Sequence, residues 1–273
     1  MIPKIIHYCW LSDDPMPKES IDYVSSWHNI LPEYKFILWN REKFDINLVP
    51  WVKEAFAQKK YAFAADYIRL FAVYNYGGIY LDSDIELKKT FDDLLNRKLI
   101  IGYENKGQYG IEAGCFGAEK GHAFIEKCLL HYKDLHFVNN DGSFNTKTLP
   151  MIMYETVTND LKKEIFPYDF FTAKSQDLGI IEETSNTYAI HHFAGTWLTD
   201  FEKSVQRATA RVYSKYRCKM IGKIILIFLI VLFRFKYEGF LKSVKYYEKN
   251  YLVPQKAVDA IKKIGCFFRR KDG

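Results

Sequence analysis

The chain has 273 residues, enough for one large hydrophobic core and an appended segment. Its hydrophobic fraction of 48% and charged fraction of 26% are typical of a globular protein. The five cysteines are far apart, odd in number and form no C-x-x-C pair, so they indicate neither a zinc site nor a disulfide framework. Reduced thiols are therefore expected.

The formal charge of +6 is unevenly distributed along the chain. Residues 203–273 carry 18 Lys and Arg against 4 Asp and Glu, whereas the preceding 202 residues carry 21 against 29. An acidic body followed by a strongly basic segment predicts that this segment binds a polyanion, either anionic lipid or nucleic acid. The change of sign places the expected domain boundary after Asp200, with a main domain at 1–200 and an extension at 201–273.

The chain opens with alternating strand and helix signals. Residues 4–10 and 35–39 predict strands, and residues 20–29 between them predict a helix. This order is typical of an α/β fold. The first residues lack the basic stretch and long apolar run of a signal peptide, so we expect the first strand to begin the fold directly.

A long helical region follows and ends at two glycines. Residues 52–76 favour helix, with a break near residues 59–60, and Gly77-Gly78 supplies the residue type that helix C-termini prefer. Residues 79–81 then predict a short strand that runs directly into Asp82. Later strands are expected at 99–103, 115–118 and 188–193, and later helices at 121–132 and 148–159.

Two acidic residues, Asp82 and Asp84, flank Ser83 at the end of this predicted strand. In a regular strand they would point to opposite faces, but a turn would let one bind a metal directly and the other act through water or a ribose. Carboxylate oxygens suit Mg²⁺ or Mn²⁺, which bridge phosphate oxygens. Such a triplet also occurs by chance in surface loops, so its meaning depends on its context.

The context includes two charged residues on the preceding helix. Asp66 and Arg69 are three positions apart, so they share one helix face and can point into one cleft. Arg69 would place a fixed cation beside a phosphate. The alternative is an ion pair within the helix on a solvated surface.

Three stretches carry a family resemblance: IPKIIHYCW at 2–10, AADYIRL at 64–70 and YNYGGIYLDSD at 74–84. The last two resemble the D-x-D-containing sugar-binding region of glycosyltransferase family 32, and the first resembles that family's first strand. Related patterns occur in yeast-type initiating α-mannosyltransferases and in glucosylating bacterial toxins. The resemblance implies a GT-A (Rossmann-like) α/β fold, a mixed sheet flanked by helices, to which this chain adds a basic helical C-terminal extension.

The resemblance also implies roles for the motif residues. Asp82 and Asp84 correspond to the metal ligands, and Asp66 and Arg69 to residues that bind the donor sugar's hydroxyls and the diphosphate. These four are the expected catalytic residues.

The remaining contacts to the nucleotide sugar are assigned to Trp10, Tyr80 and Ser83. Trp10 would stack on the base, and a core tryptophan is the alternative. His7, in the first strand, is expected to be a hydrogen-bonded core histidine rather than a ligand.

A later stretch, HHFAGTW at 191–197, resembles the family's H-x-x-x-x-[ST]-W pattern through His191, Thr196 and Trp197. In such enzymes this loop completes the metal shell and closes over the diphosphate. An imidazole ligand shifts the expected cation from Mg²⁺ towards Mn²⁺. Only one of two successive strand residues can face the metal, and we expect it to be His192, one residue nearer the loop. The alternative is that both histidines only pack or form hydrogen bonds.

Glu112 stands where relatives often carry an asparagine near the transferred sugar. It is expected either to face donor or acceptor hydroxyls or to be a surface carboxylate. Residues 139–142 predict a turn, which could also line an acceptor groove.

Family 32 enzymes are retaining, so the resemblance implies an α-linked product from an α-linked nucleotide sugar. We expect substitution on one face of the sugar, with the diphosphate helping to deprotonate the acceptor and the protein supplying positioning and electrostatics. The expected donor is a UDP-linked hexose or N-acetylhexosamine rather than GDP-mannose. A metal-dependent nucleotide-sugar hydrolase and a non-catalytic membrane-bound carbohydrate-binding subunit are the alternatives.

The basic extension contains an unbroken run of ten apolar residues, 224–233, with Lys and Arg on both sides. A bilayer span takes about 20 residues, so the pattern predicts a helix lying in an anionic membrane surface. A buried helix with a solvated basic face is the alternative. Nucleic acid is not expected, because no recognised binding motif accompanies the charge. We therefore expect a cytoplasmic enzyme, peripheral on the inner face of the membrane, that extends a glycan or lipid-linked acceptor in bacterial surface polysaccharide synthesis.

Overall fold

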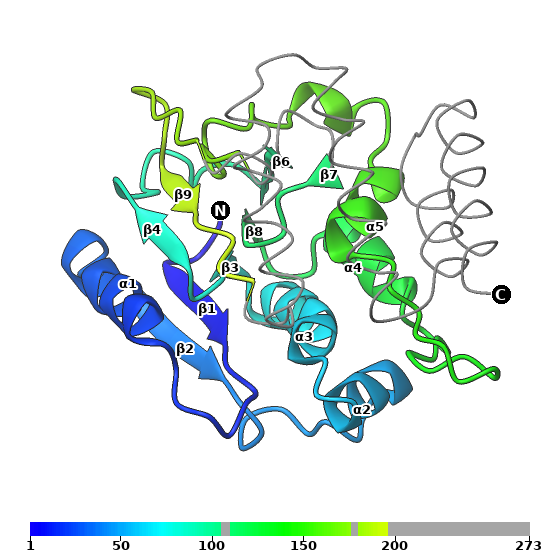
Figure 1. The fold of residues 1–273 in the computed structure, drawn as a ribbon. Coiled ribbons are helices and arrows are strands. Elements are labelled where there is room, and N and C mark those ends of the chain that lie inside the picture. Colours follow the sequence, from blue (N-terminus) through cyan, green and yellow to red (C-terminus); the bar gives the residue numbers. More distant parts are fainter. Residues whose placement is uncertain (105–109, 176–179, 196–273) are drawn as a thin grey trace, which may run out of the picture. The chain divides into compact units, whose positions relative to one another are not determined.

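A computed structural model describes residues 1–104, 110–175 and 180–195 of the protein (Figure 1). The extension at 201–273, with its apolar run at 224–233, lies outside the described residues. The domain boundary and the membrane contact therefore stay predictions. In the part of the chain that the structure describes, no helix is both long enough and apolar enough to cross a bilayer.

A central sheet of five strands, in the order β2-β1-β3-β8-β5, organises the fold (Figure 1). β1 (Ile5–Cys9) pairs in parallel with β2 (Lys35–Trp39) on one side and with β3 (Gly78–Leu81) on the other. β8 (Cys115–Ala118) lies antiparallel between β3 and β5 (Leu99–Ile100). The expectation of a mixed α/β sheet is confirmed in the described residues.

Two short antiparallel pairs complete the strands. β4 (Ile85–Leu87) pairs with β9 (Ala189–His191), and β6 (Tyr103–Glu104) pairs with β7 (Gly110–Ile111). Neither β4 nor β7 was predicted from the sequence. The strand expected at 99–103 is split into β5 and β6, because the chain leaves β8 after Ile100 and bonds to Phe166 instead.

The helices form where the sequence predicts them. They are α1 (Lys18–Ile30), α2 (Pro50–Ala57), α3 (Tyr61–Tyr76), α4 (Ala123–Leu130) and α5 (Leu149–Thr156). A short 3-10 helix at Leu161–Lys163 was not predicted. The expected break between α2 and α3 is confirmed, and Lys59 there has a φ of +56°.

Alternate residues of β3 supply the two halves of the core. Ile79 and Leu81 pack with Trp27 of α1, whereas Tyr80 packs on the opposite face with Phe116 and residues of α3. α1 therefore covers one face of the sheet, and α2, α3, α4 and α5 contribute to the core on the other.

Gly77 and Gly78 connect α3 to β3. Gly77 has a φ of +66°, and its N–H donates to Val73 O at 2.8 Å, which ends the helix as expected. At Gly78, whose φ is +111°, a Cβ would lie 2.5 Å from Ile5 O. Only glycine therefore lets the chain pass this close to β1. The strand that begins here is β3, and Asp82 follows directly after it.

His7 of β1 is fully buried, and both of its ring nitrogens are hydrogen-bonded. Trp39 Nε1 donates to His7 Nδ1 at 3.1 Å, so Nε2 carries the hydrogen and donates to Gly77 O at 2.8 Å. Burial lowers the pKa of His7 to about 4, which keeps the ring neutral. The expectation of a hydrogen-bonded core histidine is confirmed.

Two smaller expectations are also confirmed. Residues 139–142 form a turn in which the Gly142 N–H donates to Asn139 O at 2.8 Å. The three cysteines in the described part of the chain, Cys9, Cys115 and Cys128, are free thiols.

Candidate functional site

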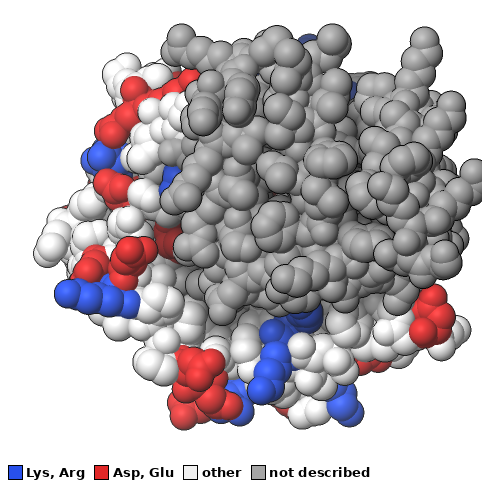
Figure 2. Space-filling model, viewed as in Figure 1, with Lys and Arg blue, Asp and Glu red and all other residues white. Residues whose placement is uncertain are grey.

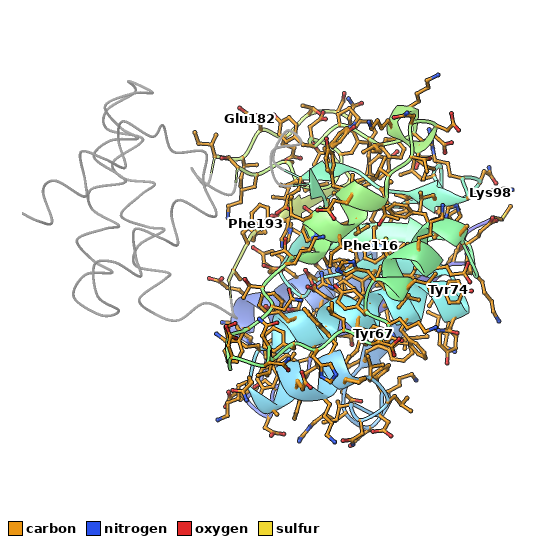
Figure 3. The ribbon with its side chains drawn as sticks, turned by 90° about the vertical axis from the view of Figure 1, so that its right-hand side faces the viewer. Tyr67, Tyr74, Lys98, Phe116, Glu182 and Phe193 are labelled. Atoms are coloured by element: carbon orange, nitrogen blue, oxygen red, sulfur yellow. The ribbon has the colours of Figure 1, made fainter. Side chains whose placement is uncertain are left out.

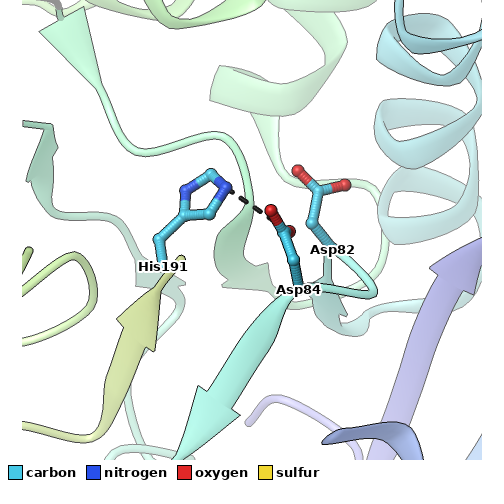
Figure 4. A group of neighbouring side chains, drawn as sticks. All are labelled: Asp82, Asp84 and His191. Carbon is cyan, nitrogen blue, oxygen red and sulfur yellow. Dashed lines mark ion pairs between the residues drawn. The ribbon is translucent and has the colours of Figure 1, made fainter. Parts of the chain in front are cut away.

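The chain turns immediately after β3. Asp82 N–H donates to Gly114 O at 2.7 Å, and Ile85 N–H then donates to Asp82 O at 3.0 Å. Ser83 lies in this turn and is partly exposed. The turn required at the strand end is therefore present, and it brings the carboxylates of Asp82 and Asp84 to neighbouring positions (Figure 4).

The pairing of β4 with β9 brings His191 to the two aspartates. The register places Ile85 opposite His191, and His191 Nε2 lies 3.5 Å from Asp84 Oδ1 (Figure 4). One ligand atom from each of Asp82, Asp84 and His191 lies within 4.8 Å of the others. Two ligands on opposite sides of a Mg²⁺ or Mn²⁺ ion are about 4 Å apart. A small closing movement would therefore let the three side chains hold one such ion, and the imidazole favours Mn²⁺.

His192, which we expected at the metal, faces away from the aspartates. Its Nε2 lies 2.8 Å from Glu86 Oε2, and its ring stacks on Tyr23 with 4.8 Å between centroids. Lys174 Nζ donates to the His192 carbonyl oxygen at 2.8 Å. The expectation is wrong because successive strand side chains alternate, and the register of β9 on β4 turns His191 towards the aspartates.

The segment after β9 is tied to the acidic turn. Ala194 N–H donates to Asp84 Oδ2 at 2.7 Å, and the Phe193 ring stacks on His191 with 4.1 Å between centroids. Figure 3 shows Phe193 at one edge of the described side chains, whereas Phe116 lies in the interior. Thr196 and Trp197 lie outside the described residues, so their roles stay predictions.

Arg69 of α3 holds Asp82 from the buried side. Its Nη1 donates to Asp82 Oδ2 at 3.1 Å and to Ala113 O at 2.8 Å, and its Nη2 lies 3.4 Å from Asp66 Oδ1. The side chains of Arg69 and Asp66 are only 7% and 12% exposed. The alternative of an ion pair on a solvated surface is therefore wrong, although the ion pair itself is present.

Tyr80 and Trp10 differ in what they offer a ligand. Tyr80 is buried, and its hydroxyl donates to Asp82 Oδ1 at 2.8 Å, so it orients that carboxylate. Trp10 is half-buried after β1, and its Nε1 donates to Asp14 O at 2.9 Å. Trp10 is therefore not a core tryptophan, and its stacking on a base stays a prediction.

Glu112 lies behind His191. It is 1% exposed, so the alternative of a surface carboxylate is wrong. Its Oε1 accepts from Gly114 N–H at 2.6 Å and lies 3.0 Å from His191 Nδ1, and its Oε2 accepts from Thr172 Oγ1 at 2.7 Å. Burial opposes its ionisation, but His191 and these hydrogen bonds lower the pKa of Glu112. The sequence carried no signal for this contact, because it joins residues 79 positions apart.

Buried carboxyls dominate the electrostatics of the site. Burial raises the pKa of Asp66 to about 7 against the effect of Arg69, and burial together with Glu112 raises the pKa of Glu104 to about 8. Burial and Asp84 raise the pKa of Asp82, also against Arg69. Burial alone would lower the pKa of His191, but the carboxylates around it raise it to about 10.

These shifts describe a site with excess negative charge, which a divalent cation would relieve. On the described surface visible in Figure 2, by contrast, acidic and basic side chains are interspersed.

Comparisons with known proteins support the resemblance inferred from the motifs. Residues 17–100 match the family described as "Glycosyltransferase sugar-binding region containing DXD motif". Inositol phosphoceramide mannosyltransferase 3 of Schizosaccharomyces pombe is 33% identical over 128 residues, which are 45% of this chain and 35% of that protein. A mannosyl phosphorylinositol ceramide synthase of Saccharomyces cerevisiae is 31% identical over 140 residues, which are 49% of this chain and 36% of that protein. The matching part thus spans about a third of these curated relatives.

Similar solved structures include two glycosyltransferases. The PaToxG glycosyltransferase has a TM-score of 0.47 and 20% identity, covering 60% of this chain and 70% of that chain. A glycosyltransferase involved in the glycosylation of the major capsid of PBCV-1 has a TM-score of 0.39 and 15% identity, covering 71% of this chain and 95% of that chain.

Proposed function

We propose that this chain, whose residues 17–100 match the glycosyltransferase sugar-binding region containing the DXD motif, is a metal-dependent glycosyltransferase that uses a nucleotide-diphosphate sugar. The observation that carries the proposal is the cluster of Asp82, Asp84 and His191. Two of its members stand in the motif, and the third is brought to them by β9.

Asp82, Asp84 and His191 would hold a divalent cation, with Mn²⁺ favoured over Mg²⁺ by the imidazole. When bound, the cation offsets the negative charge that develops on the leaving diphosphate. The protein orients the aspartates beforehand: Tyr80 and Arg69 each bond one oxygen of Asp82, and the Ala194 N–H bonds Asp84. Carboxylates fixed in this way need little reorganisation during the reaction.

The other described residues suit donor binding. Asp66, with a pKa of about 7, can both donate and accept a hydrogen bond at neutral pH, which fits a sugar hydroxyl. The guanidinium of Arg69 is already engaged by Asp82, Asp66 and Ala113 O. We propose that Arg69 acts on the diphosphate mainly through the position of Asp82.

The proposed reaction retains the configuration of the sugar. The bond from the anomeric carbon to the diphosphate oxygen breaks, and a bond from the acceptor oxygen forms on the same face. The acceptor hydroxyl gives its proton to the departing diphosphate, so no protein nucleophile is required. The protein contributes by positioning both substrates.

The donor and acceptor proposals have separate support. The relatives' names specify mannose as the sugar and an inositol phosphoceramide, a lipid, as the acceptor. These names favour mannose as the transferred hexose, in competition with the UDP-linked hexose that the sequence analysis favours. A lipid-linked acceptor agrees with the basic extension, and we propose that the enzyme works peripherally on an anionic cytoplasmic membrane face. Bacterial surface polysaccharide synthesis stays a prediction.

Nucleotide release from the full chain with Mn²⁺ tests the proposal. The donors are GDP-mannose, UDP-glucose, UDP-galactose and UDP-N-acetylglucosamine, each with and without vesicles that contain a phosphoinositol lipid. Release that needs metal and rises with the acceptor supports a transferase. Metal-dependent release that ignores every acceptor supports a hydrolase, and no release with any donor supports a binding subunit.

A further inference from the structure

We infer that Glu112 is a positioning residue that fixes the His191 ring so that Nε2 points at the aspartates. The inference rests on the proposed function, because it concerns the metal ligands of that site. It assigns Glu112 a role other than contact with sugar hydroxyls. The donors on Glu112, the tautomer of His191 and the packing of Gly114 each support it.

The first observation is that donors at fixed positions surround the Glu112 carboxylate. Gly114 N–H and Thr172 Oγ1 donate to different oxygens, at 2.6 and 2.7 Å. Oε1, which receives the Gly114 N–H, also lies 3.0 Å from His191 Nδ1. A carboxylate bonded from several sides has one orientation, so it can impose one orientation on the ring it contacts.

The second observation concerns the tautomer of His191. An ionised carboxylate only accepts hydrogen bonds, so Nδ1 must carry the hydrogen that it shares with Glu112. Nε2 is then the ring nitrogen from which a cation can displace the proton, and it is the nitrogen that lies 3.5 Å from Asp84 Oδ1. The same contact therefore determines which nitrogen binds and where it points.

The third observation is the packing at Gly114. A Cβ there would lie 2.8 Å from His191 Cε1, 2.9 Å from Glu112 Oε1 and 3.0 Å from Asp82 Oδ2. The Gly114 carbonyl also accepts from Asp82 N–H. The Glu112–Gly114 segment therefore packs between His191 and Asp82, and it sets the distance between these two side chains.

Glu112→Gln tests the inference, since it keeps the shape of the side chain and removes its charge. Binding of Mn²⁺ alone to the full chain is followed by the electron paramagnetic resonance of free Mn²⁺, and Mg²⁺ is measured by competition. We expect Mn²⁺ affinity to fall about 10- to 100-fold. Mg²⁺ affinity should fall less, because imidazole contributes less to a Mg²⁺ site, so the preference for Mn²⁺ shrinks.

Glu104→Gln is the matched control. Glu104 is also a buried carboxyl near His191, but its Oε2 has no hydrogen-bond partner among the described residues. We expect Mn²⁺ affinity to stay within about threefold of the parent. Glu112→Gln with unchanged Mn²⁺ affinity, or with equal losses for both metals, would overturn the inference.

A second variant covers the case in which Glu112→Gln does not fold. Thr172→Val removes one donor to Glu112 and leaves the Glu112–His191 contact. A folded Thr172→Val protein with weakened Mn²⁺ binding supports the inference, and unchanged binding overturns it. Failure of the parent chain to bind Mn²⁺ would instead count against the metal site of the proposed function.

Discussion

Two regions of the molecule each contain a histidine that is largely removed from water and has both ring nitrogens engaged, yet the two rings differ in charge. His7 in β1 contacts Trp39 Nε1 and Gly77 O, which are uncharged, and its pKa falls to about 4. His191 in β9 contacts Glu112 and Asp84, and its pKa rises to about 10.

The difference shows that burial alone does not decide the charge of a histidine. Removal from water disfavours the charged ring in both regions. Among carboxylates the Coulomb attraction exceeds that penalty, whereas at His7 the hydrogen bond to Gly77 O offsets only part of it. One region is therefore built for packing and the other to hold positive charge, whether from a proton or from a metal ion.

The largest effect is expected from removing one acidic group from the charged region. Asp84→Asn keeps an acceptor for the Ala194 N–H but deletes a carboxylate ligand. We expect transfer, measured as nucleotide release, to fall by about 10²- to 10³-fold with loss of Mn²⁺ binding. Asp45→Asn, in an exposed loop, is the control and should act like the parent. Full transfer by Asp84→Asn would refute the metal assignment.

The neutral ring of His7 should make the free energy of unfolding depend on pH. The folded pKa of His7, about 4, lies below its unfolded value of 6.5, so the unfolded chain binds the extra proton first. The contribution of His7 to the free energy of unfolding is therefore fully present above pH 6.5 and is lost as the pH falls towards 4. Between pH 7 and pH 4.5 we expect a loss of about 2–3 kcal/mol in the free energy of unfolding.

The matched variant for this measurement is His7→Gln, which cannot titrate. Carboxylates also titrate in this range, so the His7 contribution is the difference between the two denaturation series. Parallel pH profiles for the parent and His7→Gln would contradict a neutral buried ring. The pKa of His191 is raised, so its contribution to the free energy of unfolding changes with pH in the opposite direction. In the metal-free protein this contribution is present below pH 6.5 and is lost as the pH rises towards 10.

A smaller effect separates the two adjacent histidines. We expect His191→Asn to weaken Mn²⁺ binding about 10- to 100-fold and His192→Asn to change it by less than about threefold. The reason is that His191 Nε2 faces Asp84, whereas His192 Nε2 faces Glu86. Isothermal titration with Mn²⁺ checks both variants, and the reverse order of effects would contradict the register of β9 on β4.

The smallest effect is expected at Gly114. Gly114→Ala would crowd His191, Glu112 and Asp82, and we expect a loss of about 1–3 kcal/mol in the free energy of unfolding. Gly121→Ala is the comparison: its φ of +73° strains an alanine, but a Cβ there meets nothing within 4 Å. Only Gly114→Ala should also weaken Mn²⁺ binding. Equal Mn²⁺ affinities in the two variants would show that the packing at Gly114 does not set the ligand positions.

The elements between residues 50 and 84 could be predicted because their signals are local. Alanine-rich sequence favours α3, Gly77 and Gly78 supply the backbone conformations that end it, and Asp82 follows a short apolar strand. β4 and β7 could not be predicted from the sequence, because each has three residues or fewer and is stabilised by pairing with a partner strand rather than by a local sequence pattern. The role of Glu112 also could not be predicted, because its partner His191 lies 79 positions away in β9.

The sequence by itself predicted that Asp66, Arg69, Asp82 and Asp84 belong to one site, because all four stand in the two stretches, 64–70 and 74–84, that carry the family resemblance. Helix periodicity adds that Asp66 and Arg69 share one helix face. Tertiary structure decided which histidine faces them, because the side chains of β9 take their direction from its register on β4. It also decided which histidine is charged. His7 and His191 are the same residue type and both are largely removed from water, so the opposite shifts of their pKa values come from the groups that distant strands bring to them.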